Sequence, residues 1–223
     1  MKRSEDRSQK TEDQITIAIP KGRNLKPSIE IFKSIGLNAS PMIEDTRRLL
    51  FDLSRENVKF LVIRDTDIPT YVEYGAADIG VSGKDVLTEQ GRDIYEPLDL
   101  KFGFCRMVLA EPKELRAEDD PSKWTHIRVA TKFPKITENY FRNKGIQVEI
   151  VKLYGSIELA PIVGLSERIV DLVSSGQTLK ENGLVEVEEI MKITARLIVN
   201  RASLKTKYER INKIIEELRK QIK

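Results

Sequence analysis

The sequence holds a single cysteine, Cys105, and a single histidine, His126, in 223 residues. One cysteine excludes a disulfide framework, and the two residues together fall short of the ligand set of a zinc site. We expect Cys105 to be structural. No run approaches the roughly 18 apolar residues of a membrane span. Residues 1–14 are charged and lack the apolar core of a signal peptide. These absences predict a cytoplasmic protein without membrane contact, and a disordered polar tail over residues 1–14.

A strong net charge is also missing. The 38 Lys and Arg residues nearly balance the 35 Asp and Glu residues, which leaves a formal net charge of +3. So small an excess argues against a nucleic-acid partner, and any anion site must come from local clusters. The content of 40% hydrophobic and 33% charged residues is typical of a soluble globular protein. The length allows one large domain or two small ones.

The sequence does contain short β-branched runs that alternate with helical patterns, as in parallel α/β proteins. Expected strands cover residues 15–19, 58–64, 78–82, 97–111, 127–131, 147–154 and 168–174, and expected helices cover residues 26–35, 67–75, 83–91, 135–145 and 156–164. We predict two α/β lobes: domain I over residues 15–104 and 186–223, and domain II over residues 105–185. Two lobes joined by two crossing segments form a cleft, where small molecules commonly bind.

The last segment, residues 202–223, predicts an amphipathic helix. Its apolar residues recur at spacings of three and four, which gives nearly three heptads. They are Leu204, Tyr208, Ile211, Ile215, Leu218 and Ile222. This apolar seam either packs on its own domain or contacts another subunit, and both readings stay open.

Ligands of parallel α/β sheets bind at the carboxyl ends of strands, where four polar clusters of this sequence fall. The first, "PKGR", places Lys21 and Arg23 around Gly22. Glycine lets the backbone approach a ligand closely, and both cations pair well with phosphate. A solvated turn explains the same residues.

Two further clusters follow later strands. Arg64 stands at a strand end, and Asp67 is placed to cap the next helix, so an ordinary capping turn competes with a binding role. Ser82 and Gly83 lie between a strand and a helix, whose free N–H groups can accept an anion. The glycine spacing there matches neither the P-loop nor the dinucleotide-binding motif.

The fourth cluster is the segment "DLVSSGQTLKENG", residues 171–183. An apolar strand carrying Asp171 runs into a small, hydroxylated loop and then a helix start. Free N–H groups, hydroxyls and the positive end of a helix dipole suit a phosphate. A phosphate site next to a carboxylate suits a phosphorylated sugar, with Asp171 facing the ribose hydroxyls. An ordinary helix cap, with Asp171 exposed to solvent, is the alternative.

Taken together, these segments resemble the ATP phosphoribosyltransferase family. The matching pieces are "PKGR" (20–23), "RDTDIPTYVEYGAADIGVSGKD" (64–85), "CRMVLA" (105–110), "GSIELAP" (155–161) and "IVDLVSSGQTLKENGL" (169–184). They occur in the family's order and cover nearly all of residues 15–200. The resemblance implies two α/β lobes of the type II periplasmic-binding-protein kind around a cleft. It also implies the first reaction of histidine biosynthesis, in which ATP and phosphoribosyl pyrophosphate (PRPP) give N1-(5-phosphoribosyl)-ATP and pyrophosphate with Mg²⁺.

The resemblance also implies roles for residues. The loop residues implied at the 5′-phosphate of PRPP are Ser174, Ser175, Gly176, Gln177 and Thr178, with Asp171 at the ribose. Asp171 and Glu158 are our candidates for stabilising positive charge at the reacting ribose carbon, although Glu158 also fits an ordinary helix start. The residues expected at ATP or pyrophosphate are Lys21, Gly22, Arg23, Arg64, Ser82 and Gly83. Mg²⁺ is expected on the substrate phosphates, with no protein ligands assigned.

The chain resembles the short form of the family, which lacks the C-terminal regulatory domain. Short-form members work with a separate subunit resembling histidyl-tRNA synthetase, in a hetero-octamer, and the seam of residues 204–222 would then serve assembly. Two rivals remain: a two-lobed module that only binds a small molecule, and a phosphoribosyltransferase for another base. Fold alone does not separate them.

Overall fold

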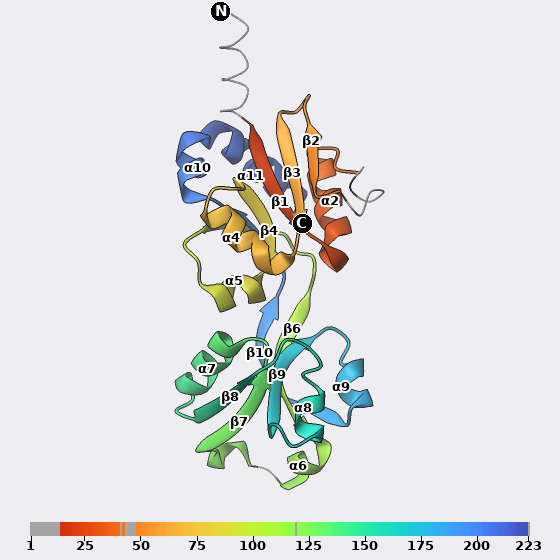
Figure 1. Cartoon of the computed structure of the whole chain (residues 1–223), viewed down its shortest axis with the longest axis vertical. Helices are drawn as coiled ribbons and strands as arrows, with labels where there is room; N and C mark the ends of the chain where they lie inside the picture. The colour runs from red at the N-terminus through yellow and green to blue at the C-terminus, as the bar shows by residue number, and fades with distance from the viewer. Residues whose placement is uncertain (1–13, 41, 43–47, 119, 223) are drawn as a thin grey trace, which may run out of the picture. The chain divides into compact units, whose positions relative to one another are not determined.

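The computed structural model in Figure 1 describes residues 14–40, 42, 48–118 and 120–222, so all of the predicted tail except Gln14 lies outside the described residues. The chain divides into two compact units. Unit 1 takes in the described residues up to Leu87, Gly91–Gly103 and the residues from Thr194 onward, and unit 2 takes in Thr88–Gln90 and Phe104–Ile193. Each unit is built on its own β-sheet.

Unit 1 contains a six-stranded sheet in the order β2-β3-β1-β4-β11-β5. Its strands are β1 (Ile15–Pro20), β2 (Leu50–Leu53), β3 (Val58–Ile63), β4 (Ile79–Gly83), β5 (Tyr95–Asp99) and β11 (Ala195–Val199). Its described helices include η1 (Gly22–Asn24), α2 (Leu25–Ser34), η2 (Asp65–Asp67), α4 (Ile68–Glu73), α5 (Lys84–Gln90), α10 (Arg201–Thr206) and α11 (Tyr208–Gln221), and the end of α5, Thr88–Gln90, falls in unit 2. The central strands β3, β1 and β4 are parallel, so their carboxyl ends share one edge of the sheet.

The period-2 pattern of β1 explains how helices cover both faces of this sheet. Ile15, Ile17 and Ile19 are fully buried and share a core cluster with residues of α2 and α11. Ala18 lies on the opposite face and packs with residues of α4. Apart from Thr16, the strand is apolar on both sides because both faces are covered, as expected for a central parallel strand.

Unit 2 contains a five-stranded sheet in the order β10-β6-β9-β7-β8. Its strands are β6 (Cys105–Pro112), β7 (His126–Thr131), β8 (Gln147–Lys152), β9 (Arg168–Val173) and β10 (Leu184–Ile193). Its helices are α6 (Lys113–Glu118), η3 (Pro121–Lys123), α7 (Pro134–Asn143), α8 (Leu159–Ile162) and α9 (Gln177–Glu181). Strands β9, β7 and β8 are parallel, whereas β6 and β10 are antiparallel to their neighbours. One core cluster packs the sheet against α7, and another packs it against α8 and α9.

The structure differs from the sequence expectation at the two points where the chain changes unit. The expected strand over 97–111 is two strands in different sheets, β5 and β6, because Lys101 and Gly103 take positive φ angles of 58° and 67° and break the run. On the return, β10 pairs along β6, so unit 2 extends to Ile193 rather than ending at residue 185. Cys105 is buried within β6, in keeping with a structural role.

The expected C-terminal helix is two helices. Lys207 leaves the helical conformation between α10 and α11, and its ammonium lies 3.0 Å from each carboxylate oxygen of the buried Asp78. Asn200 caps α10 by accepting from the Ser203 N–H at 2.7 Å, and it donates to the Val72 carbonyl at the same distance. These bonds tie the end of the chain to the unit 1 sheet.

The apolar seam packs mostly on its own unit. Its residues in the core of unit 1 are Ile211, Ile215 and Leu218, with Leu204 and Ile222 packed against that core. Tyr208 is exposed. The first of the two open readings is therefore the one the structure supports, and little of the seam is left for assembly. Among the described residues, no helix combines the length and apolar composition needed to cross a membrane.

A buried ion pair joins two strands of unit 2. Arg168 Nε donates to Glu111 Oε2 at 2.9 Å, both side chains are almost inaccessible to water, and the guanidinium lies 4.0 Å from the Trp124 ring centroid. Replacing Glu111 by Gln leaves the Arg168 charge buried with weaker compensation, so we expect a loss of about 3–5 kcal/mol in unfolding free energy. Urea denaturation measures this loss. The exposed Glu138–Arg142 pair is the matched control, for which Glu138→Gln should cost less than about 1 kcal/mol. Equal effects of the two changes would contradict the structural role of the buried pair.

Candidate active site

The loop that follows β9 has the local structure of an anion site. Strand β9 ends at Val173, the chain turns through Ser174–Gly176, and α9 begins at Gln177. Gly176 is the N-cap and has a φ of 75°, a left-handed conformation that favours glycine. No side chain caps this helix, and only a long contact of 3.4 Å links the Gln177 N–H to Ser175 Oγ. The first turn therefore keeps N–H groups available for a ligand.

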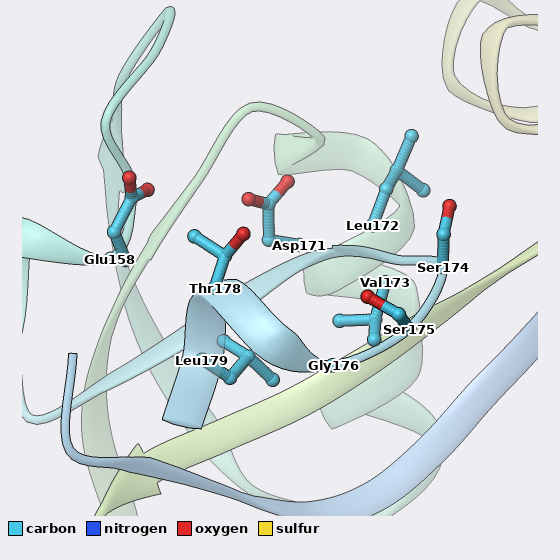
Figure 2. Close-up of a pocket in the computed structure, with 9 residues that line it drawn as sticks. All are labelled: Glu158, Asp171, Leu172, Val173, Ser174, Ser175, Gly176, Thr178 and Leu179. Atoms are coloured by element: carbon cyan, nitrogen blue, oxygen red, sulfur yellow. The ribbon is translucent and has the colours of Figure 1, made fainter. Parts of the chain in front are cut away.

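This loop forms one wall of a pocket of about 260 Å³ that lies entirely within unit 2. Its lining residues are Glu158, Asp171, Leu172, Val173, Ser174, Ser175, Gly176, Thr178 and Leu179. Figure 2 shows the carboxyl group of Asp171 next to the hydroxyl of Thr178, with the carboxyl group of Glu158 on a separate segment that also lines the pocket. Hydroxyls, free N–H groups and two carboxylates thus surround one small cavity, which suits a phosphorylated sugar.

The electrostatics of the pocket centre on Asp171. Burial raises the pKa of this carboxyl above its ordinary value of 3.8. A hydrogen bond from the Leu172 N–H lowers the pKa, the negative charge of Glu158 raises it, and the positive charge of Lys132 lowers it. The balance is a raised pKa, which is a common feature of functional carboxyls.

Glu158 reaches the pocket from the other wall. It occupies the N-cap position of the short helix α8 but makes no side-chain capping bond. Glu158 therefore does not cap the start of α8 with its side chain, which was the alternative to a role in the site. Its carboxylate instead faces the same cavity as that of Asp171.

Lys132 is a pocket neighbour that our sequence reasoning missed. It follows Thr131, the last residue of β7, and β7 runs parallel to β9 with Thr131 paired to Val170. The residue after Val170 is Asp171, so the two side chains belong to neighbouring strand ends. The rule that flagged the other clusters applies here too, because Lys132 also follows a strand at its carboxyl end.

The expected ATP or pyrophosphate residues lie in unit 1. Strands β1 and β3 pair Pro20 with Ile63, so Lys21 and Arg64 follow neighbouring strands at one edge. Lys21, Arg23 and Arg64 are all exposed there. Gly22 has a φ of 81° and open space where a Cβ would lie. The structure thus brings the cations of two predicted clusters to one edge.

Ser82 and Gly83 are engaged by the protein itself. The Ser82 hydroxyl and the Gly83 N–H both donate to Asp65 Oδ1, at 2.8 and 3.3 Å. A Cβ on Gly83 would also meet Asp85 Oδ1 at 2.2 Å. Carboxylates of the chain therefore occupy the place expected for a ligand anion. Asp67, expected to cap α4, makes no capping bond.

The fold is that of two-lobed periplasmic-binding-protein-like proteins of type II. The periplasmic aliphatic sulphonate binding protein SsuA from Escherichia coli matches with a TM-score of 0.55 and 12% identity, over 92% of this chain and 71% of that chain. An identity this low speaks for the fold alone.

Closer relatives define the family. The ATP phosphoribosyltransferase family model matches residues 64–220. ATP phosphoribosyltransferase 2 of Geobacter sulfurreducens is 63% identical over 94% of this chain and 99% of its own length. The solved ATP phosphoribosyl transferase (HisG:HisZ) complex from Thermotoga maritima contains a chain with 37% identity and a TM-score of 0.79, over 94% of this chain and 98% of that chain. This chain belongs to the ATP phosphoribosyltransferase family. The resemblance read from the sequence is confirmed, and neither rival, the binding module nor the transferase for another base, is supported.

Proposed function

We propose that this chain transfers the phosphoribosyl group of PRPP to N1 of ATP, as the first step of histidine biosynthesis, with the site residues assigned below. The observation that carries the assignment is the pocket of unit 2, where the uncapped start of α9 adjoins the half-buried Asp171 carboxyl. In this reaction N1 of adenine forms a bond to ribose C1′ as the bond from C1′ to pyrophosphate breaks. The substrates supply nucleophile and leaving group, so the protein needs no nucleophile of its own.

The residues of unit 2 hold the sugar phosphate. Ser174 to Thr178 bind the 5′-phosphate through N–H groups and hydroxyls, and Asp171 accepts from the ribose hydroxyls. The carbon C1′ gains positive character as pyrophosphate departs. The Asp171 and Glu158 carboxylates stabilise that charge, and their effect is strong because the pocket is partly shielded from water.

The residues of unit 1 bind the other anionic groups. Lys21, Arg23 and Arg64 offer three exposed cations at one sheet edge, and Gly22 allows close backbone approach. They bind phosphates of ATP or the departing pyrophosphate. Ser82 and Gly83 join them only if Asp65 gives up the bonds it now accepts.

A divalent metal, which we propose to be Mg²⁺, fits the phosphates of the substrate better than a cage of side chains. Among the described residues, no three His, Cys, Asp or Glu side chains stand close enough to hold an ion on their own. Mg²⁺ commonly reaches such sites on substrate phosphates. When bound there, it neutralises charge on the leaving pyrophosphate.

A partner subunit and a location complete the proposal. The Thermotoga maritima relative was solved as a HisG:HisZ complex. We propose that this chain is likewise a short-form catalytic subunit that works in the cytoplasm with a subunit resembling histidyl-tRNA synthetase, in a hetero-octamer.

An absorbance assay tests the proposal. The purified chain is mixed with ATP, PRPP, Mg²⁺ and pyrophosphatase, and the near-ultraviolet absorbance of phosphoribosyl-ATP is followed with and without the partner subunit. We expect product, and a rate difference between the two tubes measures dependence on the partner. No product in either tube, with PRPP binding intact by calorimetry, would contradict ATP as the acceptor.

A further inference from the structure

The phosphoribosyl pocket of unit 2 poses an electrostatic problem. PRPP carries a 5′-phosphate and a diphosphate, while the charged side chains that line the pocket are the carboxylates of Glu158 and Asp171. Helix N–H groups offset one phosphate. Mg²⁺ on the substrate offsets part of the charge of the diphosphate, but none of the described residues that line the pocket has a cationic side chain, so a cation of unit 2 close to Asp171 would favour binding.

The order of strands in the sheet indicates on which side of Asp171 the 5′-phosphate and the diphosphate of PRPP lie. Helix α9 leads from β9 to β10, and a Cβ on Gly176 would stand 3.4 Å from Glu186 Oε1 on β10. The 5′-phosphate loop is therefore displaced from β9 toward β10. In the sheet, β7 lies on the other side of β9. A ribose held over Asp171, with its 5′-phosphate in the loop, directs C1′ and its diphosphate toward the end of β7.

Lys132 stands at that end and is firmly placed there. The preceding Thr131 is fully buried, and its hydroxyl donates to the Val170 carbonyl of β9 at 2.8 Å. The same hydroxyl oxygen accepts from the Phe133 N–H at 2.9 Å. Thr131 is thus tied to the strand that carries Asp171 and Phe133 is tied to Thr131, while the Lys132 side chain between them is exposed. The positive charge of Lys132 interacts with the Asp171 carboxyl and lowers its pKa.

We propose that Lys132 binds the diphosphate of PRPP and is the side-chain cation with which unit 2 holds this anion beside two carboxylates. This inference rests on the proposed function and adds a substrate contact to it. Lys132 binds the diphosphate end of the substrate, and the loop Ser174–Thr178 binds the 5′-phosphate end.

Calorimetric titrations with two ligands test the inference. PRPP carries the diphosphate, whereas ribose 5-phosphate has only the 5′-phosphate. Lys132→Met should weaken PRPP binding in the presence of Mg²⁺ by about tenfold or more, the size of a lost hydrogen bond to a charged group. Ribose 5-phosphate affinity should change by less than about twofold. Lys132→Arg keeps the charge and should restore most of the PRPP affinity.

The control is Lys135→Met, which removes the same charge from an exposed residue three positions further on. It should bind both ligands like the unaltered chain. An equal loss for PRPP and ribose 5-phosphate, or unchanged PRPP affinity in Lys132→Met, overturns the diphosphate assignment. Failure of the unaltered chain to bind PRPP overturns the proposed function instead, so the two failures are distinguishable.

Discussion

Replacing Asp171 by Asn is expected to lower kcat/KM for phosphoribosyl transfer by roughly 100-fold or more while the chain stays folded. The amide has nearly the shape of the carboxyl group but carries no negative charge for the positive C1′ of the transition state. Losing one electrostatic contact to a transition state commonly costs 10²–10³-fold in rate. Steady-state kinetics with ATP and PRPP measures the loss, and unchanged kinetics would remove Asp171 from the site.

The same variant makes a stability prediction of opposite sign. Burial raises the pKa of Asp171 in the folded chain above 3.8, so the carboxyl favours folding in its protonated form and loses that contribution as pH rises through the folded pKa. The amide that replaces this carboxyl does not titrate. Asp171→Asn should therefore unfold no earlier than the unaltered chain at pH 7, and the difference should shrink as pH falls toward 3.8. Thermal unfolding between pH 4 and 8 checks this; a variant that is less stable only at neutral pH would contradict the assigned cause.

Replacing Gly176 by Val is expected to abolish detectable PRPP binding. Gly176 has a φ of 75°, where a β-branched residue is strained, and its Cβ would stand 3.4 Å from Glu186 Oε1. Either the turn shifts or the side chain fills the approach to the first N–H groups of α9, and both results disturb the phosphate site. Calorimetry should show at least about a 100-fold loss of affinity, equivalent to the several charge-assisted hydrogen bonds of a phosphate.

Gly183→Val supplies the matched control for this experiment. Gly183 follows the other end of α9, has a φ of 70° and has open space where a Cβ would lie. The control therefore carries comparable backbone strain of about 1–3 kcal/mol without entering the phosphate loop. Equal loss of PRPP binding in both variants would show a general effect of strain and would count against the phosphate assignment.

The sequence predicted most of the architecture because alternation is a local signal. Apolar runs such as Ile15–Ile19 are bounded by Pro and Gly, and their period does not depend on distant contacts. The break near Gly103 between β5 and β6 was not predicted, because an apolar run does not show that its two ends belong to different sheets. The interruption of the C-terminal helix at Lys207 was also not predicted, since it depends on Asp78, which lies 129 positions away in the sequence.

The site was predictable to the extent that strand ends could be located. Asp171 and the Ser174–Thr178 loop follow from one contiguous segment, and the structure gathers them with Glu158 around one pocket. Lys132 was missed because a lone lysine after a strand carries no motif, and its neighbour Asp171 appears only when β7 and β9 are paired. The bonds from Ser82 and Gly83 to Asp65 likewise depend on a fold contact that spacing does not reveal.

The most direct test of the central claim is a crystal structure of the chain with PRPP and Mg²⁺. We expect the 5′-phosphate on the N–H groups of Gly176 to Thr178, the ribose hydroxyls against Asp171, and the diphosphate toward Lys132. A 5′-phosphate bound anywhere other than the loop after β9 would contradict the account of this site.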